Sequence, residues 1–507
     1  MVCISQVLAG VAHVLNETAE YTQLLPFTNS INLSDAISIR VRTKDLLLSN
    51  DLPPAITYSS AEDPVKKAES LLTGKKEKAV LVEHVNVRNE SSDPNLRSEG
   101  YYHPYPSVGY RVLAAAKMFN VIEMFFPYHQ FMDKNWKEVF ASSLHEFVNA
   151  RDRNEYGLAV AKMYAHLNDS HGFIRGNPAL DDLRGEAASP LSVDYIEDKV
   201  VVARFRSDSL CKANNISIGD IVTKVNGVKI EDLMKKYEMY FAHSTPAAIK
   251  EWAARASIRG PRGDEVTYTI EDRNGKSRDV KFFWSNEYDR YFRLKFNLDT
   301  IQLISKEIGY ADLTRMEGSQ TDTMFEKFKN TKAIIFDMRG YPKGTAWTIA
   351  PRLTEEKDVP LALFRRNEIL SPKLRSGDIL SQRTYSEFIQ TVAATDKWKY
   401  KGKTVMLIDH NAISQSEHSG LFFESMNNTI FVGSETAGAN GDVTNFTIPG
   451  NMILYFSGQG VWHADGRQLQ RVGLKPHVAV KPTIKGIRAG KDEVLEKAIE
   501  WIGKNVK

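Results

Sequence analysis

The sequence predicts a multidomain protein of the α/β class, α+β over its whole length, with a large α/β core at its C-terminal end. Three observations support this prediction. Helical periodicity dominates residues 106–187, short β-type runs fill residues 188–285, and fully apolar strands alternate with helical segments over residues 286–507. A chain of 507 residues is long enough for about two to four domains. Residues 1–105 form a fourth region, to which the sequence assigns no role.

The N-terminal region is expected to contain a helix near Val7–Leu15 and a strand over Ala79–Val85. Residues 88–106 contain several Pro, Asn, Ser and Tyr residues, which predicts a loop. In the region that follows, Pro127 ends one helix and Gly172 is the expected helix-ending residue of another. The helices predicted there span residues 110–126, 136–150 and 155–167.

Residues 188–285 are predicted to be mainly β-structure. The segment Asn215–Ile230 has a Gly-Asp turn before a strand and a tight Asn-Gly turn after it. It resembles the core of a PDZ domain, a fold that binds extended peptides in an open groove beside a strand. The resemblance implies capture or gating of a peptide, and inert packing is the alternative. The strands expected here span residues 199–203, 220–225 and 265–270.

The apolar strands of the last region predict a sheet covered on both faces by helices. Ligands bind at the carboxyl ends of such strands. Asp337 and Ser414 both follow such an end. The predicted core strands span residues 308–313, 333–337, 404–408 and 429–433.

Composition argues against several classes of function. A net charge of +3, with 25% charged residues, is not that of a nucleic-acid-binding protein. Cys3 and Cys211 lie too far apart for a disulfide framework or a metal knuckle. The sequence has no apolar run of about 18 residues, as a membrane span requires. Its N-terminus also lacks the basic patch followed by an apolar core that marks a signal peptide. We therefore expect a cytoplasmic protein, or a periplasmic, cell-envelope or secreted one if a leader was removed.

The most informative motif is Asn411-Ala-Ile-Ser-Gln-Ser-Glu417, directly after an apolar strand. It predicts a strand that turns into a helix over Glu417–Met426, with Ser414 raised at the turn. The first amides of such a helix point the same way as the serine, an arrangement that displays an acyl-transfer nucleophile. The structural alternative is an ordinary N-cap made by Ser414 or Ser416.

Three further loops contain candidate site residues, and two of them have both a structural and a chemical interpretation. After the second core strand, Asp337 and Arg339 could pair as a cap, or Gly340 could bring an amide close to a substrate carbonyl. His171 could cap a helix or act as a base. The glycine-rich turn Gly433–Asp442 could wall a substrate cleft. No histidines have metal-ligand spacing such as His-Glu-x-x-His, so neither a metal nor another cofactor is predicted.

Taken in chain order, these loops resemble one family, the serine peptidases of the C-terminal processing (tail-specific) protease and tricorn-core group. The similarity extends from about Tyr110 to the C-terminus and includes Val432–Gly438 and Asp465–Pro476. It implies a ClpP/crotonase-like α/β catalytic core, a helical segment and an inserted PDZ-like β domain. It also implies a serine-type endopeptidase for peptides or unfolded proteins, with no nucleic-acid partner and no membrane span. A homo-oligomer is left open.

The family has two catalytic arrangements. Tail-specific members use a Ser-Lys dyad whose lysine lies in the turn that matches Gly433–Asp442, where Ala439 stands in this chain. Tricorn-like members use a histidine from a Ser-His pair, which Ser170-His171 matches. The resemblance therefore implies attack by Ser414 with His171 as general base. It further assigns oxyanion donation to the amides of Gly340 and Gln415, substrate binding to Gly438 and Ala439, and support of the base to Ser170 and Gln470.

One position departs from the family pattern. The supporting carboxylate of the family falls at Gln470, whose amide can hydrogen-bond the Ser170 hydroxyl but cannot stabilise an imidazolium by charge. Asp169 and Glu417 are nearby carboxylates that could compensate. The competing hypotheses are a non-catalytic peptide- or lipophile-binding protein on the same scaffold, and a PDZ adaptor with a degenerate catalytic domain.

Overall fold

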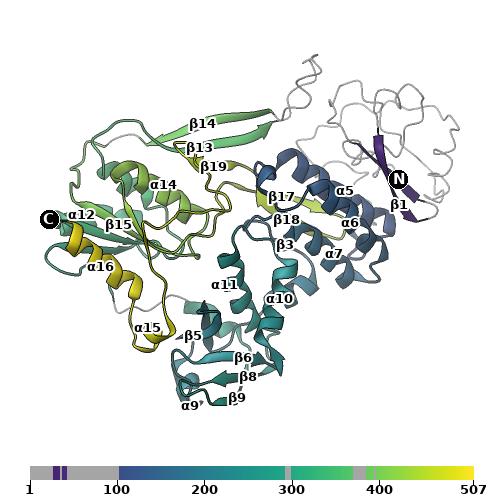
Figure 1. The fold of residues 1–507 in the computed structure, drawn as a ribbon, viewed down its shortest axis with the longest axis horizontal. Helices are drawn as coiled ribbons and strands as arrows, with labels where there is room; N and C mark the ends of the chain where they lie inside the picture. Colours follow the sequence, from purple (N-terminus) through teal and green to yellow (C-terminus); the bar gives the residue numbers. More distant parts are fainter. Residues whose placement is uncertain are drawn as a thin grey trace.

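The computed structural model describes residues 27–34, 37–42, 102–291, 298–368, 384–392 and 395–506. The helix expected near Val7 and the strand expected at Ala79–Val85 lie outside these residues. Near the N-terminus, β1 (Phe27–Ser34) pairs antiparallel with β2 (Ile37–Arg42). Beyond them, Figure 1 shows an α/β core, a helical lobe and a small β lobe arranged around a common centre.

The helical lobe confirms the three predicted helices as α5 (Val108–Phe125), α6 (Trp136–Asn149) and α7 (Arg153–Ala165). The prediction that Gly172 ends the third helix is wrong. Helix α7 ends at Ala165, and Asn168 then takes a left-handed conformation with φ 54°. The amide of Gly172 instead closes a turn by donating to the Asp169 carbonyl at 2.8 Å.

A three-stranded sheet closes the helical lobe on the side of the core. Its strands are β3 (Ile174–Arg175), β17 (Val443–Ile448) and β18 (Met452–Ser457), in the order β17-β18-β3. Phe446, Leu454 and Phe456 pack with the helices in one apolar cluster. The amide of Tyr455 donates to the Phe173 carbonyl at 2.9 Å, so the end of β18 lies beside the turn that follows α7.

The β lobe contains a sheet in the order β4-β5-β6-β8-β9, with β7 paired to β6. All three predicted strands are present, and the predicted Asn-Gly turn has positive φ at both Asn226 and Gly227. A cavity of about 320 Å³ opens between β5, β6 and α10. The elements are β4 (Leu191–Ile196), β5 (Lys199–Phe205), β6 (Ile221–Val225), β7 (Val228–Lys229), α10 (Ile230–Tyr240), α11 (Pro246–Ser257), β8 (Glu265–Glu271) and β9 (Ser277–Phe283).

The core sheet has the order β10-β11-β12-β15-β16-β20, and all of its strands except β10 run parallel. Alternate side chains face opposite ways. Phe336 packs with α12 and α14 on one face, whereas Ile335 packs with α16 on the other. The predicted covering of both faces is therefore confirmed. The elements are β10 (Ile301–Leu303), β11 (Ile308–Asp312), α12 (Thr321–Phe328), β12 (Ala333–Asp337), β15 (Lys403–Ile408), α14 (Gln415–Asn427), β16 (Ile430–Gly433), β20 (Val478–Ala479) and α16 (Glu493–Asn505).

A second sheet of the core, in the order β14-β13-β19, extends as a long hairpin toward the helical lobe (Figure 1). It comprises β13 (Val359–Glu368), β14 (Thr384–Val392) and β19 (Gly460–His463). Short helices complete the described chain: α8 (Pro178–Arg184), α9 (Asp208–Ala213), α13 (Ala346–Ile349) and α15 (Ile484–Arg488).

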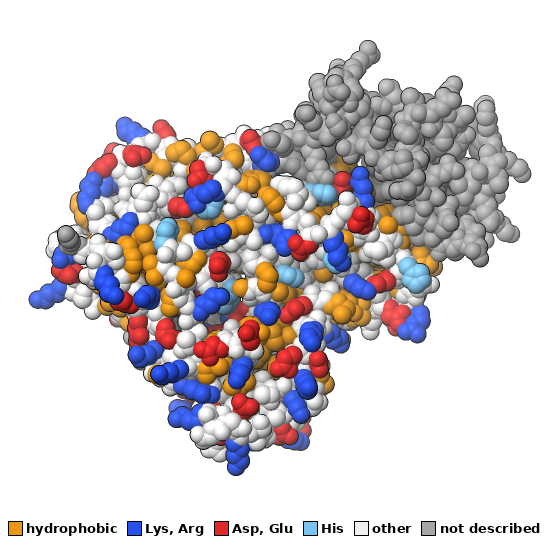
Figure 2. All heavy atoms as spheres, viewed as in Figure 1, with side chains coloured by type: hydrophobic (Ala, Val, Ile, Leu, Met, Phe, Trp, Pro, Cys, Tyr) orange, Lys and Arg blue, Asp and Glu red, His pale blue; other side chains and the backbone are white. Residues whose placement is uncertain are grey.

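The surface is electrostatically mixed. Acidic and basic side chains are interspersed over the face shown in Figure 2, as the small net charge leads one to expect. Among the described helices, none combines the length and apolarity that a membrane crossing requires.

Candidate active site

Ser414 stands where strand β15 turns into helix α14, as predicted. Its backbone has φ 58° and ψ −116°. A positive φ is rare for a residue with a side chain and stores strain. An ordinary N-cap residue has its backbone in the β region instead. Although Ser414 does form a capping box with Glu417, its backbone geometry is that of an elbow that lifts the serine from the sheet.

The carboxylate of Glu417 holds this elbow against the glycine-rich turn. It accepts hydrogen bonds from the amides of Gly438 (2.8 Å), Ala439 (2.9 Å) and Ser414 (3.3 Å), and from the Thr436 hydroxyl. Burial raises the pKa of Glu417 to about 7, and these hydrogen bonds oppose the rise. One carboxylate thus joins the start of α14 to the turn after β16.

The two residues predicted to bind substrate, Gly438 and Ala439, have their backbone groups engaged inside the protein. Their amides bind Glu417, the Ala439 carbonyl accepts from the Ser414 amide at 2.8 Å, and the Gly438 carbonyl accepts from the Arg471 amide at 2.7 Å. Gly438 has φ 71°, and a Cβ there would lie 3.0 Å from Thr245 Cγ2. Their role in substrate binding stays a prediction.

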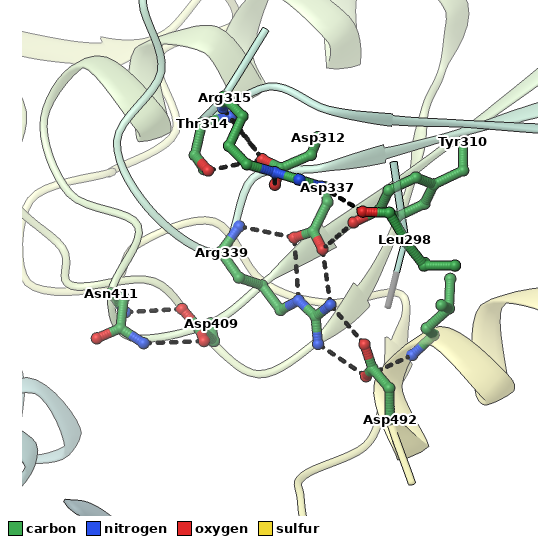
Figure 3. A network of polar contacts seen from close by, with 11 residues as sticks. Leu298, Tyr310, Asp312, Thr314, Arg315, Asp337, Arg339, Asp409, Asn411 and Asp492 are labelled. Atoms are coloured by element: carbon green, nitrogen blue, oxygen red, sulfur yellow. Dashed lines mark hydrogen bonds and ion pairs between the residues drawn. The ribbon is translucent and has the colours of Figure 1, made fainter. Parts of the chain in front are cut away.

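The loop after β12 is fixed by the buried ion-pair network of Figure 3. The Arg339 guanidinium binds Asp337 and Asp492, each at 2.7 Å from Nη2, and the Tyr310 hydroxyl donates to Asp337 at 2.9 Å. Burial opposes the charged form of Asp337, yet the Arg339 guanidinium holds the pKa of that carboxyl below its usual value. The structural interpretation of this pair is therefore correct, and the network fixes the position of Gly340.

The two predicted oxyanion donors differ in their hydrogen bonding. The Gly340 amide donates to the Met338 carbonyl at 2.8 Å, and the Gly340 carbonyl accepts from the Ser416 hydroxyl at 2.5 Å. The Gln415 amide opens α14 and has no hydrogen-bond acceptor in the described part of the chain. Gln415 therefore has an amide free to bind an oxyanion, whereas Gly340 would first have to release Met338.

The loop before Ser414 is tied to the β lobe. Asn411 binds Asp409 with its amide and its side chain (Figure 3), and its Oδ1 accepts from Arg255 Nη1 at 2.7 Å. Arg255 belongs to α11, where it also pairs with Glu251 at 2.6 Å. A cavity of about 430 Å³ lies at this junction, lined by residues that include Arg255, Tyr310, Gly340, Asn411 and Ile413.

His171 lies in the turn after α7 and is 7% exposed. Its Nδ1 is 2.8 Å from the Ser457 hydroxyl, which in turn donates to Asp169 Oδ1 at 3.1 Å. Burial lowers the pKa of His171, and the charge of Asp169 acts in the opposite direction. The imidazole is therefore neutral at pH 7, the form in which it can accept a proton.

The two residues predicted to support His171 are placed differently from the expectation. The Ser170 hydroxyl accepts from the Ser244 amide at 2.9 Å, and the Ser170 amide donates to the Ser244 hydroxyl at 2.9 Å. Gln470 does not bond to the Ser170 hydroxyl. Its Nε2 donates to Asp169 Oδ1 at 3.2 Å and to Ser244 Oγ at 3.4 Å, because the fully buried Asp169 carboxylate is the stronger acceptor.

A bridge of hydrogen bonds joins the glycine-rich turn beside Ser414 to the His171 turn. The Gln470 side chain donates to Asp169 at 3.2 Å, and the amide of its neighbour Arg471 donates to the Gly438 carbonyl at 2.7 Å. The Tyr128 hydroxyl donates to the Asn440 carbonyl of the glycine-rich turn at 2.9 Å. Burial raises the pKa of Tyr128, and the charges of Asp169 and Glu417 raise it further.

Among the described residues, no hydrogen bond links Ser414 directly to His171. Such bonds are often long in enzymes without substrate and tighten in the complex. The two segments are joined through the neighbouring residues Gln470 and Arg471.

Sequence reasoning missed Ser457 and His418. Ser457 ends β18 with no motif around it, so no sequence signal marks it. His418 lies one turn after Ser414, but its Nε2 is 2.8 Å from Gln390 Oε1 and its Nδ1 is 3.3 Å from Asn440 Nδ2. Burial lowers the pKa of His418 to about 4. Within the described chain, no three His, Cys, Asp or Glu side chains are grouped as metal ligands would be.

Two comparisons with known proteins find similarities, one to solved structures and one to a family model. Mature CPAF complexed with lactacystin matches with a TM-score of 0.60 and 14% identity, over 78% of this chain and 98% of that chain. Mature CPAF matches with a TM-score of 0.59 and 15% identity, over the same shares of the two chains. At these identities the likeness shows the fold, and no curated protein matches the sequence. Residues 307–480, a region of the core that includes Ser414, match the family model described as Peptidase family S41.

Proposed function

We propose that this protein is an endopeptidase that cleaves peptides or unfolded proteins through a Ser414 acyl-enzyme, with His171 as the general base. The observation that carries the proposal is the strained backbone of Ser414 at the junction of β15 and α14. Strain of this kind clusters at functional sites, because the surrounding fold must hold it in place. An N-cap alone has no need of it.

The proposed mechanism uses the groups around the elbow. The Ser414 oxygen attacks the peptide carbonyl while His171 Nε2 takes the hydroxyl proton and then gives it to the leaving amine. The Gln415 amide stabilises the oxyanion, joined by Gly340 if substrate displaces its bond to Met338. A single donor of this type contributes about 3 kcal/mol in comparable enzymes. Water then hydrolyses the acyl-enzyme with His171 again acting as base.

A histidine base agrees with the contents of the glycine-rich turn. Ala439, at the position of the lysine in Ser-Lys members, is fully buried, and its amide is bound to Glu417. A neutral lysine is therefore not available from this turn. His171 is buried and neutral, as a general base must be before it accepts a proton.

The β lobe, residues 188–285, is proposed to act as a PDZ-like module that captures substrate. The support is its groove, in which β5, β6 and α10 enclose about 320 Å³. Because β5 and β6 each already pair with a strand on both sides, an extended peptide would be held there by the residues lining the groove rather than by addition to the sheet. The helical region, residues 106–187, would supply His171, and the core, residues 286–507, would supply the nucleophile.

The cavity of about 430 Å³ near the elbow is proposed to accept part of the bound peptide. It adjoins the elbow at Ile413, which precedes Ser414, and at Gly340, which binds the Ser416 hydroxyl. It also reaches Arg255 of the β lobe. A chain held in the groove of that lobe could therefore pass close to the nucleophile.

The test is covalent labelling with a fluorophosphonate probe, followed by peptide mapping. We expect the probe on Ser414, and Ser414→Ala should abolish labelling without loss of fold. The matched control is Ser142→Ala, which removes a serine hydroxyl on α6 that donates to the Val139 carbonyl at 3.1 Å. A folded wild-type protein that is not labelled would contradict the proposal and favour a binding protein on the same scaffold.

A further inference from the structure

Ser457 is a residue that the family resemblance does not assign, and it lies between a carboxylate and the imidazole of His171. Its hydroxyl is 2.8 Å from His171 Nδ1 and 3.1 Å from Asp169 Oδ1. We propose that Ser457 and Asp169 are the positioning residues of the base: the hydroxyl relays the Asp169 charge to Nδ1 and keeps Nε2 free for Ser414. This inference rests on the proposed function of His171.

The direction of the hydrogen bonds follows from the number of protons available. An ionised carboxylate can only accept, and a serine hydroxyl has one proton to donate. Because Ser457 donates that proton to Asp169, its oxygen must accept from Nδ1–H of His171. In the neutral imidazole the other nitrogen then carries the lone pair. The relay thus selects the tautomer in which Nε2 is the basic atom.

The Asp169 carboxylate is held in place by several hydrogen bonds. It is completely buried, and its two oxygens receive four donors. Oδ1 accepts from the His171 amide (3.2 Å), the Ser457 hydroxyl (3.1 Å) and Gln470 Nε2 (3.2 Å), while Oδ2 accepts from the Ser457 amide (2.8 Å). Its position beside Ser457 is therefore fixed from three segments of the chain.

The relay also explains how the chain manages with Gln470 at the position of the family carboxylate. An amide cannot stabilise an imidazolium by charge, but Asp169 can, because its field acts on His171. Gln470 then acts one step further away, by orienting Asp169 through the bond at 3.2 Å. The negative charge that acts on His171 therefore comes from Asp169, whereas the family pattern places it at position 470.

The position of Ser457 is fixed by the sheet that closes the helical lobe. Its amide bond to Asp169 continues the pairing of β18 with the turn after α7, where the Tyr455 amide donates to the Phe173 carbonyl at 2.9 Å. The rings of Phe173 and Tyr455 stack with centroids 4.1 Å apart. The hydroxyl is therefore presented by a rigid strand end rather than by a loose loop.

The experiment measures the rate of fluorophosphonate labelling of Ser414 as a function of pH. Ser457→Val and Ser457→Thr have the same shape, and only threonine keeps a hydroxyl. We expect Ser457→Val to slow labelling by about 10-fold or more, with Ser457→Thr restoring most of the rate. Ser142→Ala is the control and should label at the wild-type rate.

Asp169→Asn provides the second, independent arm. The negative charge of Asp169 stabilises the imidazolium, so its loss should lower the pKa of His171. We therefore expect labelling to be about 100-fold slower and the acid limb of the rate profile to move to lower pH. The other titratable groups around Asp169 are Tyr128 and Tyr164, and burial raises the pKa of both, so they stay protonated over this range.

The outcomes separate the relay from the proposed function. If Ser457→Val and Asp169→Asn are both labelled at the wild-type rate and with the wild-type pH profile, the relay is overturned. The proposed roles of Ser414 and His171 are not affected by that result. No labelling of the folded wild-type protein would overturn the proposed function itself. If both Ser457 variants fail to fold, the Asp169→Asn profile decides, because an unshifted acid limb contradicts the relay.

Discussion

The turn that carries Ser414 is formed within one stretch of chain, whereas the imidazole of His171 is held by distant segments. The elbow consists of strand β15, a short turn and helix α14, and Glu417 of that helix ties it to the glycine-rich turn. The imidazole of His171 is bound by Ser457 of β18. Asp169 is in turn oriented by Gln470, which lies 301 residues further along the chain. One half of the site follows from local structure, and the other half follows from tertiary packing.

This difference has an energetic side. The elbow stores strain at Ser414, which the buried bonds to Glu417 and Ala439 must offset. The Ser170, His171 and Asp169 groups of the His171 turn are paired in a buried hydrogen-bond network. Substitutions in the elbow should therefore lower stability and activity together, while those in the turn should lower activity more than stability.

The largest expected effect comes from removing either reactive group. Ser414→Ala and His171→Ala should each lower the rate of peptide hydrolysis by about 10⁴-fold or more, because neither group works alone. The double variant should be no slower than either single variant. Steady-state rates of the three proteins check this, and a double variant with the product of the two losses would show that the halves act independently.

The next effect tests how tightly the elbow is packed. Gly438→Ala should lower the free energy of unfolding by about 3 kcal/mol and reduce labelling of Ser414, because a Cβ at φ 71° would also press on Thr245 and Arg471. Gly466→Ala is the control: it has φ 84° but nothing within 4 Å of the added Cβ, so about 1 kcal/mol is expected.

Urea unfolding monitored by fluorescence compares the two glycine variants with the wild type. Equal losses in both would mean that backbone strain alone is felt at Gly438. The packing of the glycine-rich turn against the β lobe and Arg471 would then be looser than the structure indicates.

A third effect concerns the brace of the elbow. The pKa of Glu417 is raised by burial to about 7 in the folded protein, against 4.5 as its ordinary value. The folded state therefore binds this proton more tightly than the unfolded state, and the contribution is fully present below pH 4.5. This contribution to the free energy of unfolding, about 3 kcal/mol in all, should be lost as the pH rises through about 7.

The difference in unfolding free energy between wild type and Glu417→Gln isolates this contribution, since other groups titrate equally in both. We expect the difference to change with pH between about 4.5 and about 7 and to be flat above and below. A difference that is constant over the whole range would show that Glu417 is ionised in the fold, held by its four donors.

The smallest effect tests substrate capture by the β lobe. Glu231 is an exposed residue of α10 that lines the groove, so Glu231→Trp should obstruct it without disturbing the fold. We expect KM for a long unfolded substrate to rise several-fold with kcat unchanged, since only binding is affected. Lys236→Trp, exposed on the same helix but outside the groove lining, should leave KM as it is. Equal KM values for all three proteins would contradict capture.

Much of the fold could be predicted from the sequence because its elements are strongly patterned. The core strands are continuous apolar runs, and α5 and α6 begin and end within two residues of the predicted bounds. The bounds of α7 also lie within two residues of the prediction, but Gly172 was wrongly given as its ending signal, because Asn168 takes the left-handed conformation. An asparagine tolerates that conformation through its short polar side chain, but the sequence offers a glycine as the stronger signal.

The site was predictable to the extent that it is local. Ser414 and its strand-to-helix turn were found from a single motif, and the pairing of Asp337 with Arg339 was foreseen as the structural alternative. The partners of His171 were not, because Ser457 reaches the imidazole only after β18 has paired beside the turn. Hydrogen bonds between residues so distant in sequence leave no trace in local spacing.

The hydrogen bond between Arg255 and Asn411 has a consequence for how the protein fails. The guanidinium belongs to the β lobe, and the side chain that it holds lies three residues before the nucleophile. Proteolytic loss or unfolding of that lobe would remove a brace from the elbow and leave Asn411 with its Asp409 contacts alone. A molecule damaged in the β lobe should then lose activity rather than become less restrained.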